Sequence, residues 1–178
     1  MSGDNRGGTD RRPWRAALSF PNPVNEVSAR LVAAGVVAMC LLATGLNLRW
    51  FTVLIAYGFV ARVASGPTFS PLGQFVTRVV TPRLGARARP VAGPPKRFAQ
   101  GVGAVFSVSA LVLTLAGLWT AAEGVLGALA LFAFLESALG LCLGCKTFAV
   151  LMRLGLVPAE VCESCNNIWL ARPGGGPA

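Results

Sequence analysis

The chain has 178 residues, of which 54% are hydrophobic and 13% are charged, and its formal net charge is +9. The charged share is about half that of a typical soluble domain, so the chain has too few polar residues to cover its surface in water. This composition excludes an ordinary soluble domain and favours a membrane protein. The basic residues flank apolar stretches, so they predict contact with anionic lipid headgroups, and nucleic acid is not an expected partner.

The N-terminal residues 1–20 are rich in Gly, Asp and Arg and show no apolar periodicity, so we expect a disordered basic arm there. A membrane domain is expected over residues 21–166, followed by a flexible tail over residues 167–178. Two prolines near the start of this domain discourage a helix before residue 24. Asn22 or Asn25 is expected to cap the first helix.

Four membrane-spanning helices are predicted at about residues 27–46, 50–64, 98–119 and 125–143. The first two spans are short and a tight turn joins them, so they form a helical hairpin. Residues 72–81 place apolar side chains at helical spacing opposite polar ones, which predicts an amphipathic helix lying in the membrane interface. The fold class is therefore all-α: a polytopic membrane protein with four spans, this interfacial helix and a short C-terminal cytoplasmic helix near the cysteines.

Lys and Arg are distributed unevenly between the two sides of this arrangement. Five lie in the N-terminal part up to Arg30, six in the central loop and three in the C-terminal part, whereas Arg49 lies in the turn on the opposite side. The positive-inside rule then places both termini and the central loop in the cytoplasm, with the chain in the cytoplasmic membrane. The lipid bilayer is the expected partner of these charges, and the oligomeric state is left open.

The cysteines form the main candidate site. Four of the five make two CxxC pairs, Cys142/Cys145 and Cys162/Cys165, with sixteen residues between the pairs, and the chain has no histidine. This spacing is typical of a tetrathiolate zinc site, and soft thiolates also accept an iron–sulfur cluster. A CxxC pair at a helix terminus can also exchange disulfides. Thiol–disulfide chemistry is the leading hypothesis, a scaffold clamped by zinc is the alternative, and inert, merely packed thiols are a third interpretation.

Helix polarity separates the two cysteine pairs. Cys142 and Cys145 are expected at the C-terminal end of the fourth span, where the helix dipole disfavours a thiolate. Cys162 and Cys165 are expected to open a further helical turn, which is the better polarity for a nucleophile. Cys40, alone in the first span, is expected to be a small buried apolar residue.

Besides Arg30 near the start of the first span, two charged residues lie within the predicted spans. Glu136 is on the inner half of the fourth span and Arg62 on the inner half of the second. A carboxylate inside a bilayer is costly, so Glu136 is a functional candidate, and an Arg62–Glu136 ion pair is the leading expectation. Arg62 could instead reach the interface, and Glu136 could stay neutral or handle protons. A small transporter that uses Glu136 is the second alternative function.

Several short motifs carry a family resemblance, and they lie at residues 21–26, 69–73, 93–100, 140–145, 155–158 and 162–165. On these motifs the chain resembles a bacterial integral-membrane family named domain of unknown function 4395, over about residues 20–166. The resemblance implies a four-span membrane protein of unassigned activity. It also suggests a thioredoxin-like or sulfurtransferase partner, which favours thiol chemistry, and it assigns no catalytic residues.

Overall fold

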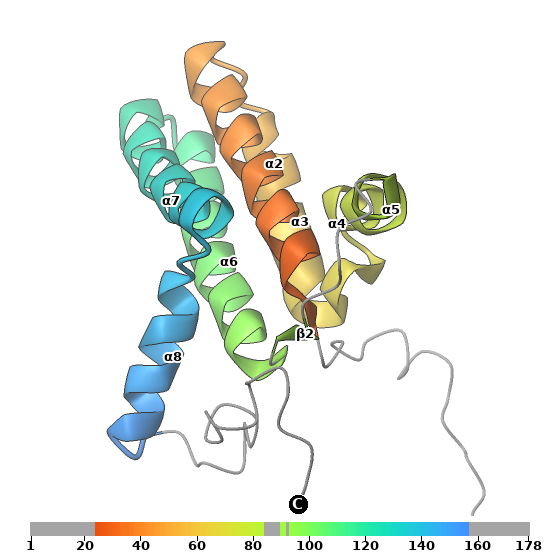
Figure 1. Ribbon diagram of the computed structural model, residues 1–178. Coiled ribbons are helices and arrows are strands. Elements are labelled where there is room, and N and C mark those ends of the chain that lie inside the picture. The colour runs from red at the N-terminus through yellow and green to blue at the C-terminus, as the bar shows by residue number, and fades with distance from the viewer. Residues whose placement is uncertain (1–23, 84–89, 92, 157–178) are drawn as a thin grey trace, which may run out of the picture.

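Four antiparallel helices form the body of the computed structural model, which describes residues 24–83, 90–91 and 93–156 (Figure 1). Two of them, α2 (Glu26–Gly45) and α3 (Phe51–Ser65), form the first hairpin. The other two, α6 (Gly93–Leu115) and α7 (Trp119–Leu139), form the second. Helix α2 packs mainly against α7, and α3 packs mainly against α6, so the two hairpins close into a bundle.

A short strand pair joins the starts of the two hairpins. Strand β1 (Val24–Asn25) pairs antiparallel with β2 (Pro90–Val91), which the sequence analysis did not predict. Asn25 then caps α2, because its side-chain oxygen accepts a hydrogen bond from the backbone N–H of Val27 at 3.0 Å. The predicted cap is therefore confirmed at Asn25, and the first turns of α2 and α6 lie at the same end of the bundle.

The predicted amphipathic helix between the hairpins is confirmed as a helix, built from several short pieces. A 3₁₀ turn, η1 (Gly66–Thr68), leads into α4 (Pro71–Phe75), the π-helical turn η2 (Val76–Val80) and α5 (Thr81–Arg83). These pieces lie beside α2 and α3 (Figure 1). One side of the segment packs closely, since a Cβ on Gly35 would lie 2.7 Å from Leu72 Cδ1, while Phe75 on another side is exposed.

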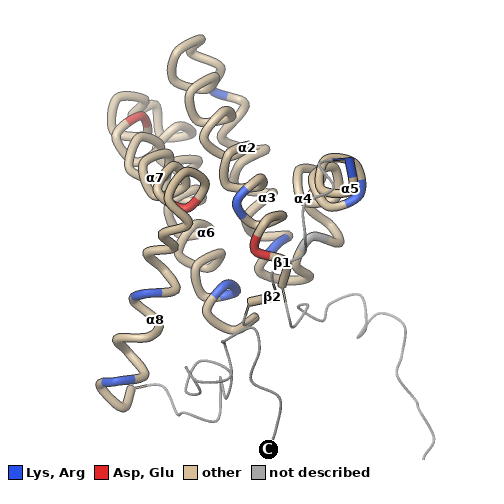
Figure 2. Tube along the Cα trace, viewed as in Figure 1, with Lys and Arg blue, Asp and Glu red and all other residues tan. Residues whose placement is uncertain are grey.

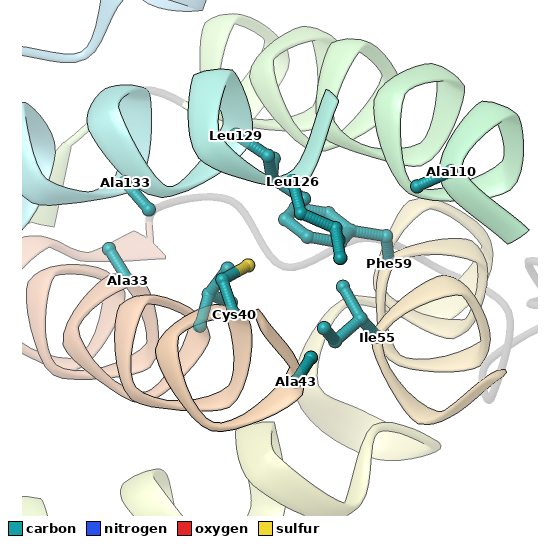
Figure 3. Close-up of a cluster of buried hydrophobic side chains, with 10 residues drawn as sticks. Ala33, Cys40, Ala43, Ile55, Phe59, Ala110, Leu126, Leu129 and Ala133 are labelled. Atoms are coloured by element: carbon teal, nitrogen blue, oxygen red, sulfur yellow. The ribbon is translucent and has the colours of Figure 1, made fainter. Parts of the chain in front are cut away.

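Alanines and larger apolar side chains together fill the centre of the bundle (Figure 3). The buried cluster takes residues from all four helices: Ala33, Val36, Cys40, Ala43, Ile55, Phe59, Ala110, Leu126, Leu129 and Ala133. Alanines at these positions let the helices approach closely, as they do in membrane helix packing. Cys40 is 1% exposed within this cluster, so the interpretation of Cys40 as a small buried residue is confirmed.

Three of the helices in the described part of the chain, α2, α6 and α7, are long and apolar enough to cross a membrane. Their most apolar stretches are only 33%, 17% and 22% buried inside the protein, so these helices present apolar side chains outward. Helix α3, the predicted second span, has 15 residues and a length of roughly 22 Å. A hydrocarbon core is about 30 Å thick, so three spans are supported by length and the fourth is not.

The ends of the third and fourth predicted spans differ from the structure. Helix α6 begins at Gly93 rather than near residue 98, because the two prolines that follow Gly93 are accommodated in its first turn. Helix α7 stops at Leu139 rather than at residue 143. A separate helix, α8 (Leu143–Arg153), then packs against α6. The position of this break decides the geometry of the first cysteine pair.

Basic residues of the bundle gather at one end (Figure 2). In the described part of the chain, Arg49 is the one Lys or Arg at the end that carries the α2–α3 and α6–α7 connections. At the opposite end, Arg30 lies in the second turn of α2, Arg62 in the last turn of α3, and Lys96 in the first turn of α6. The charge asymmetry predicted between the two sides is thus present in three dimensions.

Candidate functional site

The break between α7 and α8 shapes the candidate site. Gly140 ends α7 in the left-handed conformation, with φ of +68°, and its N–H donates to the carbonyl of Glu136 at 3.0 Å. From α2, the guanidinium of Arg30 donates to the carbonyl oxygens of Ser137 at 3.1 Å and Ala138 at 2.9 Å. A cation bonded to the last carbonyls stabilises a helix C-terminus. Arg30 therefore holds the end of α7 against α2.

Cys142 is the N-cap of α8, which corrects the prediction that the first CxxC pair ends the fourth span. The physical reason is Gly140, whose left-handed backbone stops α7 before the cysteines are reached. The dipole of α8 consequently favours a thiolate at Cys142, which is the opposite of the expectation from the sequence. Gly140 and Gly144 lie four residues apart in the sequence, and their roles differ: Gly140 ends α7, whereas Gly144 packs closely against Ala99 of α6.

The two thiols form a hydrogen-bonded pair. Cys145 Sγ donates to Cys142 Sγ at 2.8 Å, and the backbone N–H of Cys145 donates to the same sulfur at 3.4 Å. Both cysteines are free, Cys142 is buried, and Cys145 is half-buried. In this arrangement Cys142 Sγ accepts both hydrogen bonds, and Cys145 is the donor in both.

The thiol hydrogen bond from Cys145 is the main cause that lowers the pKa of Cys142 below its ordinary value. Burial and the Glu136 carboxylate oppose this shift, while the Lys96 ammonium and the backbone N–H of Cys145 support it. The same thiol bond, together with burial, raises the pKa of Cys145. Of the two thiols, Cys142 therefore has the lowered pKa and Cys145 the raised one.

Lys96 and Glu136 make an ion pair beside these thiols. Lys96 Nζ lies 2.6 Å from Glu136 Oε1, and their side chains are 10% and 16% exposed. The structure thus gives Glu136 a different partner from the predicted Arg62. Lys96 was not predicted as a partner of Glu136, because it was counted among the basic residues of the central loop. Pro94 and Pro95 were the available signal, since proline is favoured in the first turn of a helix.

Arg62 is 4% exposed and faces the interior, so it does not reach out to the interface. Its Nε donates to Gln100 Oε1 at 2.9 Å, its Nη1 donates to Ser70 Oγ at 3.1 Å, and its Cζ lies 4.4 Å from the ring centre of Phe59. Arg62 and Glu136 do line one cavity, but neither is a direct partner of the other. The sequence therefore placed both residues in one region, and the structure shows Lys96 rather than Arg62 in direct contact with Glu136.

Two hollows flank the CxxC segment. A groove of about 280 Å³ is lined by Cys142, Cys145, Lys96 and Lys146, among others, and reaches the thiols from outside the bundle. A cavity of about 380 Å³ lies inside the bundle and touches Leu143 and Gly144, the two residues between the cysteines. The thiol pair can thus be approached from the groove.

The second pair, Cys162 and Cys165, lies outside the described residues, so the meeting of four thiols stays a prediction. Within the described part of the chain, no group of three or more His, Cys, Asp or Glu side chains is arranged to hold a metal ion. The tetrathiolate zinc site requires Cys162 and Cys165, and it too stays a prediction.

A protein-family model described as Domain of unknown function (DUF4395) matches residues 24–153. The chain belongs to this family. The matched region of this DUF4395 protein contains α2 to α8 and the Cys142/Cys145 pair, while Cys162 and Cys165 follow it. The family resemblance seen in the motifs is confirmed. No curated protein and no solved structure matches the chain.

Proposed function

We propose that this DUF4395 protein is a multi-pass membrane protein that exchanges disulfides through Cys142 and Cys145. The observation that carries the proposal is the thiol pair itself: the two sulfurs lie 2.8 Å apart at the start of α8. The helix dipole and Lys96 both favour a thiolate on Cys142. The groove beside the pair gives a partner access to it.

Cys142 is the attacking thiol in this scheme, and its partner is a disulfide in a thioredoxin-like or sulfurtransferase protein. The Cys142 thiolate attacks one partner sulfur, the partner disulfide breaks, and the released partner sulfur takes up a proton. Cys145 then loses its proton and attacks Cys142 Sγ, which breaks the mixed disulfide. The products are a Cys142–Cys145 disulfide and a partner dithiol, so two electrons and two protons pass to the partner; the reverse sequence returns them.

The membrane arrangement belongs to the same proposal. Helices α2, α6 and α7 cross the bilayer by their length and hydropathy, and α3 completes a four-span bundle although it is short. Exposed apolar side chains along these helices, such as Leu41, Val60 and Val105, support contact with lipid. The basic end of the bundle faces the cytoplasm by the positive-inside rule, which puts the thiol pair and both termini on that side.

Cys162 and Cys165 have two roles open to them. As a second redox pair they would pass the disulfide between the first pair and the partner. As ligands they would complete a zinc site with Cys142 and Cys145, and the protein would then be a structural scaffold without thiol exchange. Metal content and thiol titration of the same purified sample separate these outcomes.

The test uses full-length protein purified in mild detergent without reductant. We expect no stoichiometric metal and a Cys142–Cys145 disulfide that reduces and re-forms. With a thioredoxin-like protein as the probe, Cys145→Ser should trap a mixed disulfide visible on a non-reducing gel, because the resolving thiol is missing. Cys142→Ser is the matched control and should trap none. One zinc per chain with none of the four thiols titratable would overturn the proposal.

A further inference from the structure

We propose that the cavity inside the bundle binds an amphiphilic carboxylate, with the head on Arg62 and the apolar chain among the helices. The cavity has a volume of about 380 Å³, within the range of small-molecule sites. Apolar side chains from α2, α3, α6 and α7 make most of its wall, including Val36, Phe59, Phe106 and Phe132. A wall of this kind suits an alkyl chain.

Arg62 supplies a buried charge, and no carboxylate of the described residues is in direct contact with it. Its hydrogen bonds go to two neutral side chains, Gln100 and Ser70. The Glu136 carboxylate acts on Arg62 electrostatically, but it is already bonded to Lys96 at 2.6 Å. Arg62, Lys96 and Glu136 together therefore carry one net positive charge. A buried charge of this kind is costly unless an anion is brought to it.

Two donor nitrogens are available to receive that anion. Within the described residues, Arg62 Nη2 and the amide nitrogen of Gln100 donate no hydrogen bond, although both residues line the cavity. In the described part of the chain, Trp119 Nε1 is the one fully buried side-chain nitrogen or oxygen without a hydrogen-bond partner. Arg62 Nη2 and the Gln100 amide nitrogen also lack a partner, so neither of them is fully buried. A guanidinium with a neighbouring amide presents donors that fit a carboxylate.

A smaller hollow of about 70 Å³ touches the same two residues. It has room for bound water but not for an alkyl chain, so the larger cavity is the site for the whole ligand. Leu143 and Gly144 line that larger cavity, so the bound ligand would also contact the segment between the two cysteines. The proposal does not depend on thiol exchange.

The experiment measures binding of radiolabelled dodecanoate to the full-length protein in nanodiscs of neutral phosphatidylcholine, with empty nanodiscs as the blank. Methyl dodecanoate, which has the same chain without the charge, is the matched ligand. We expect saturable binding of one dodecanoate per chain and at least about tenfold weaker binding of the ester, the loss expected for one hydrogen bond to a charged group. Equal binding of acid and ester, or no saturable binding, would overturn the proposal.

Two variants locate the head group. Arg62→Gln should lose affinity for dodecanoate by at least about tenfold and leave the ester unaffected, whereas Arg49→Gln, at the far end of the bundle, should leave both unchanged. An Arg62→Gln protein that binds dodecanoate normally would also overturn the proposal. If this variant does not fold, the comparison of acid and ester on the unmodified chain still decides the question. Cys142→Ser should bind normally, which separates this site from the thiol chemistry.

Discussion

Replacing Gly144 with alanine tests whether the contact between α8 and α6 holds the thiol pair in place. Gly144 lies between the two cysteines, and a Cβ there would stand 2.6 Å from both Cα and Cβ of Ala99 on α6. Ordinary contact begins at 3.4 Å, so α8 would have to move by about 0.8 Å. The obstacle is backbone as well as side chain, so no rotamer change relieves it. Overpacking of this kind costs about 1–3 kcal/mol.

Gly127→Ala is the matched control, because it is also a helical glycine and no atom lies within 4 Å of its added Cβ. Both variants gain the helix propensity of alanine, so their difference isolates the steric clash. In thermal unfolding of the detergent-solubilised protein, Gly144→Ala should melt roughly 2–12 °C below Gly127→Ala.

The same displacement should change the alkylation rate of Cys142, measured peptide by peptide with mass spectrometry, while Gly127→Ala leaves the rate unchanged. Equal melting temperatures and equal Cys142 reactivity in the two variants would refute the packing of α8 on α6.

Three further predictions concern the charges around the thiols and the end of α7. The pKa of Cys142 is lowered by the thiol of Cys145 and by Lys96, so the alkylation rate of Cys142 should reach half of its plateau at a lower pH than that of an ordinary cysteine. Cys145→Ala should move this midpoint to higher pH. Cys145→Ser keeps a hydrogen-bond donor and should move the midpoint less. Lys96→Met should raise the midpoint because a cation is lost, and Glu136→Gln should lower it because an anion is lost; shifts in the same direction would contradict this assignment of charges. Arg30→Gln removes two charge-assisted hydrogen bonds from the end of α7, so the free energy of unfolding should fall by about 1–3 kcal/mol. Amide hydrogen exchange around residues 136–140 should become faster. Arg78→Gln, which changes an exposed side chain, is the control and should alter neither quantity.

Local sequence was enough to predict most helices of this DUF4395 protein. The apolar runs that became α2, α6 and α7, the cap at Asn25 and the amphipathic segment after α3 all follow from interactions within a few residues. Hydrogen bonds from residue i to i−4 and side-chain periodicity are local properties, so they can be read along the chain. Helix ends were less predictable: α6 begins at Gly93 and α7 ends at Leu139, whereas the corresponding predicted spans begin near residue 98 and end near residue 143.

Partner choice among the buried charges required the tertiary structure. The apolar runs around Glu136 and Arg62 identify both as charged residues that are costly to bury. The sequence does not indicate that Lys96 is the partner of Glu136, because the two residues are forty positions apart. The choice depends on where α6 begins and on which turn of α7 faces it. Electrostatic pairing falls off over a few ångströms, so an error of one turn in a helix end exchanges one partner for another.

The amino-acid sequence by itself determined that the chain is all-helical and apolar, that basic residues gather on one side, and that cysteines occur in CxxC pairs, since composition and spacing need no folding. Only the tertiary structure decided which helix end carries Cys142. The left-handed backbone at Gly140, held by Arg30 from α2, ends one helix and lets Cys142 begin the next. The physical reason is that a helix dipole reverses between its two ends, so a break of three residues changes an unfavourable site for a thiolate into a favourable one.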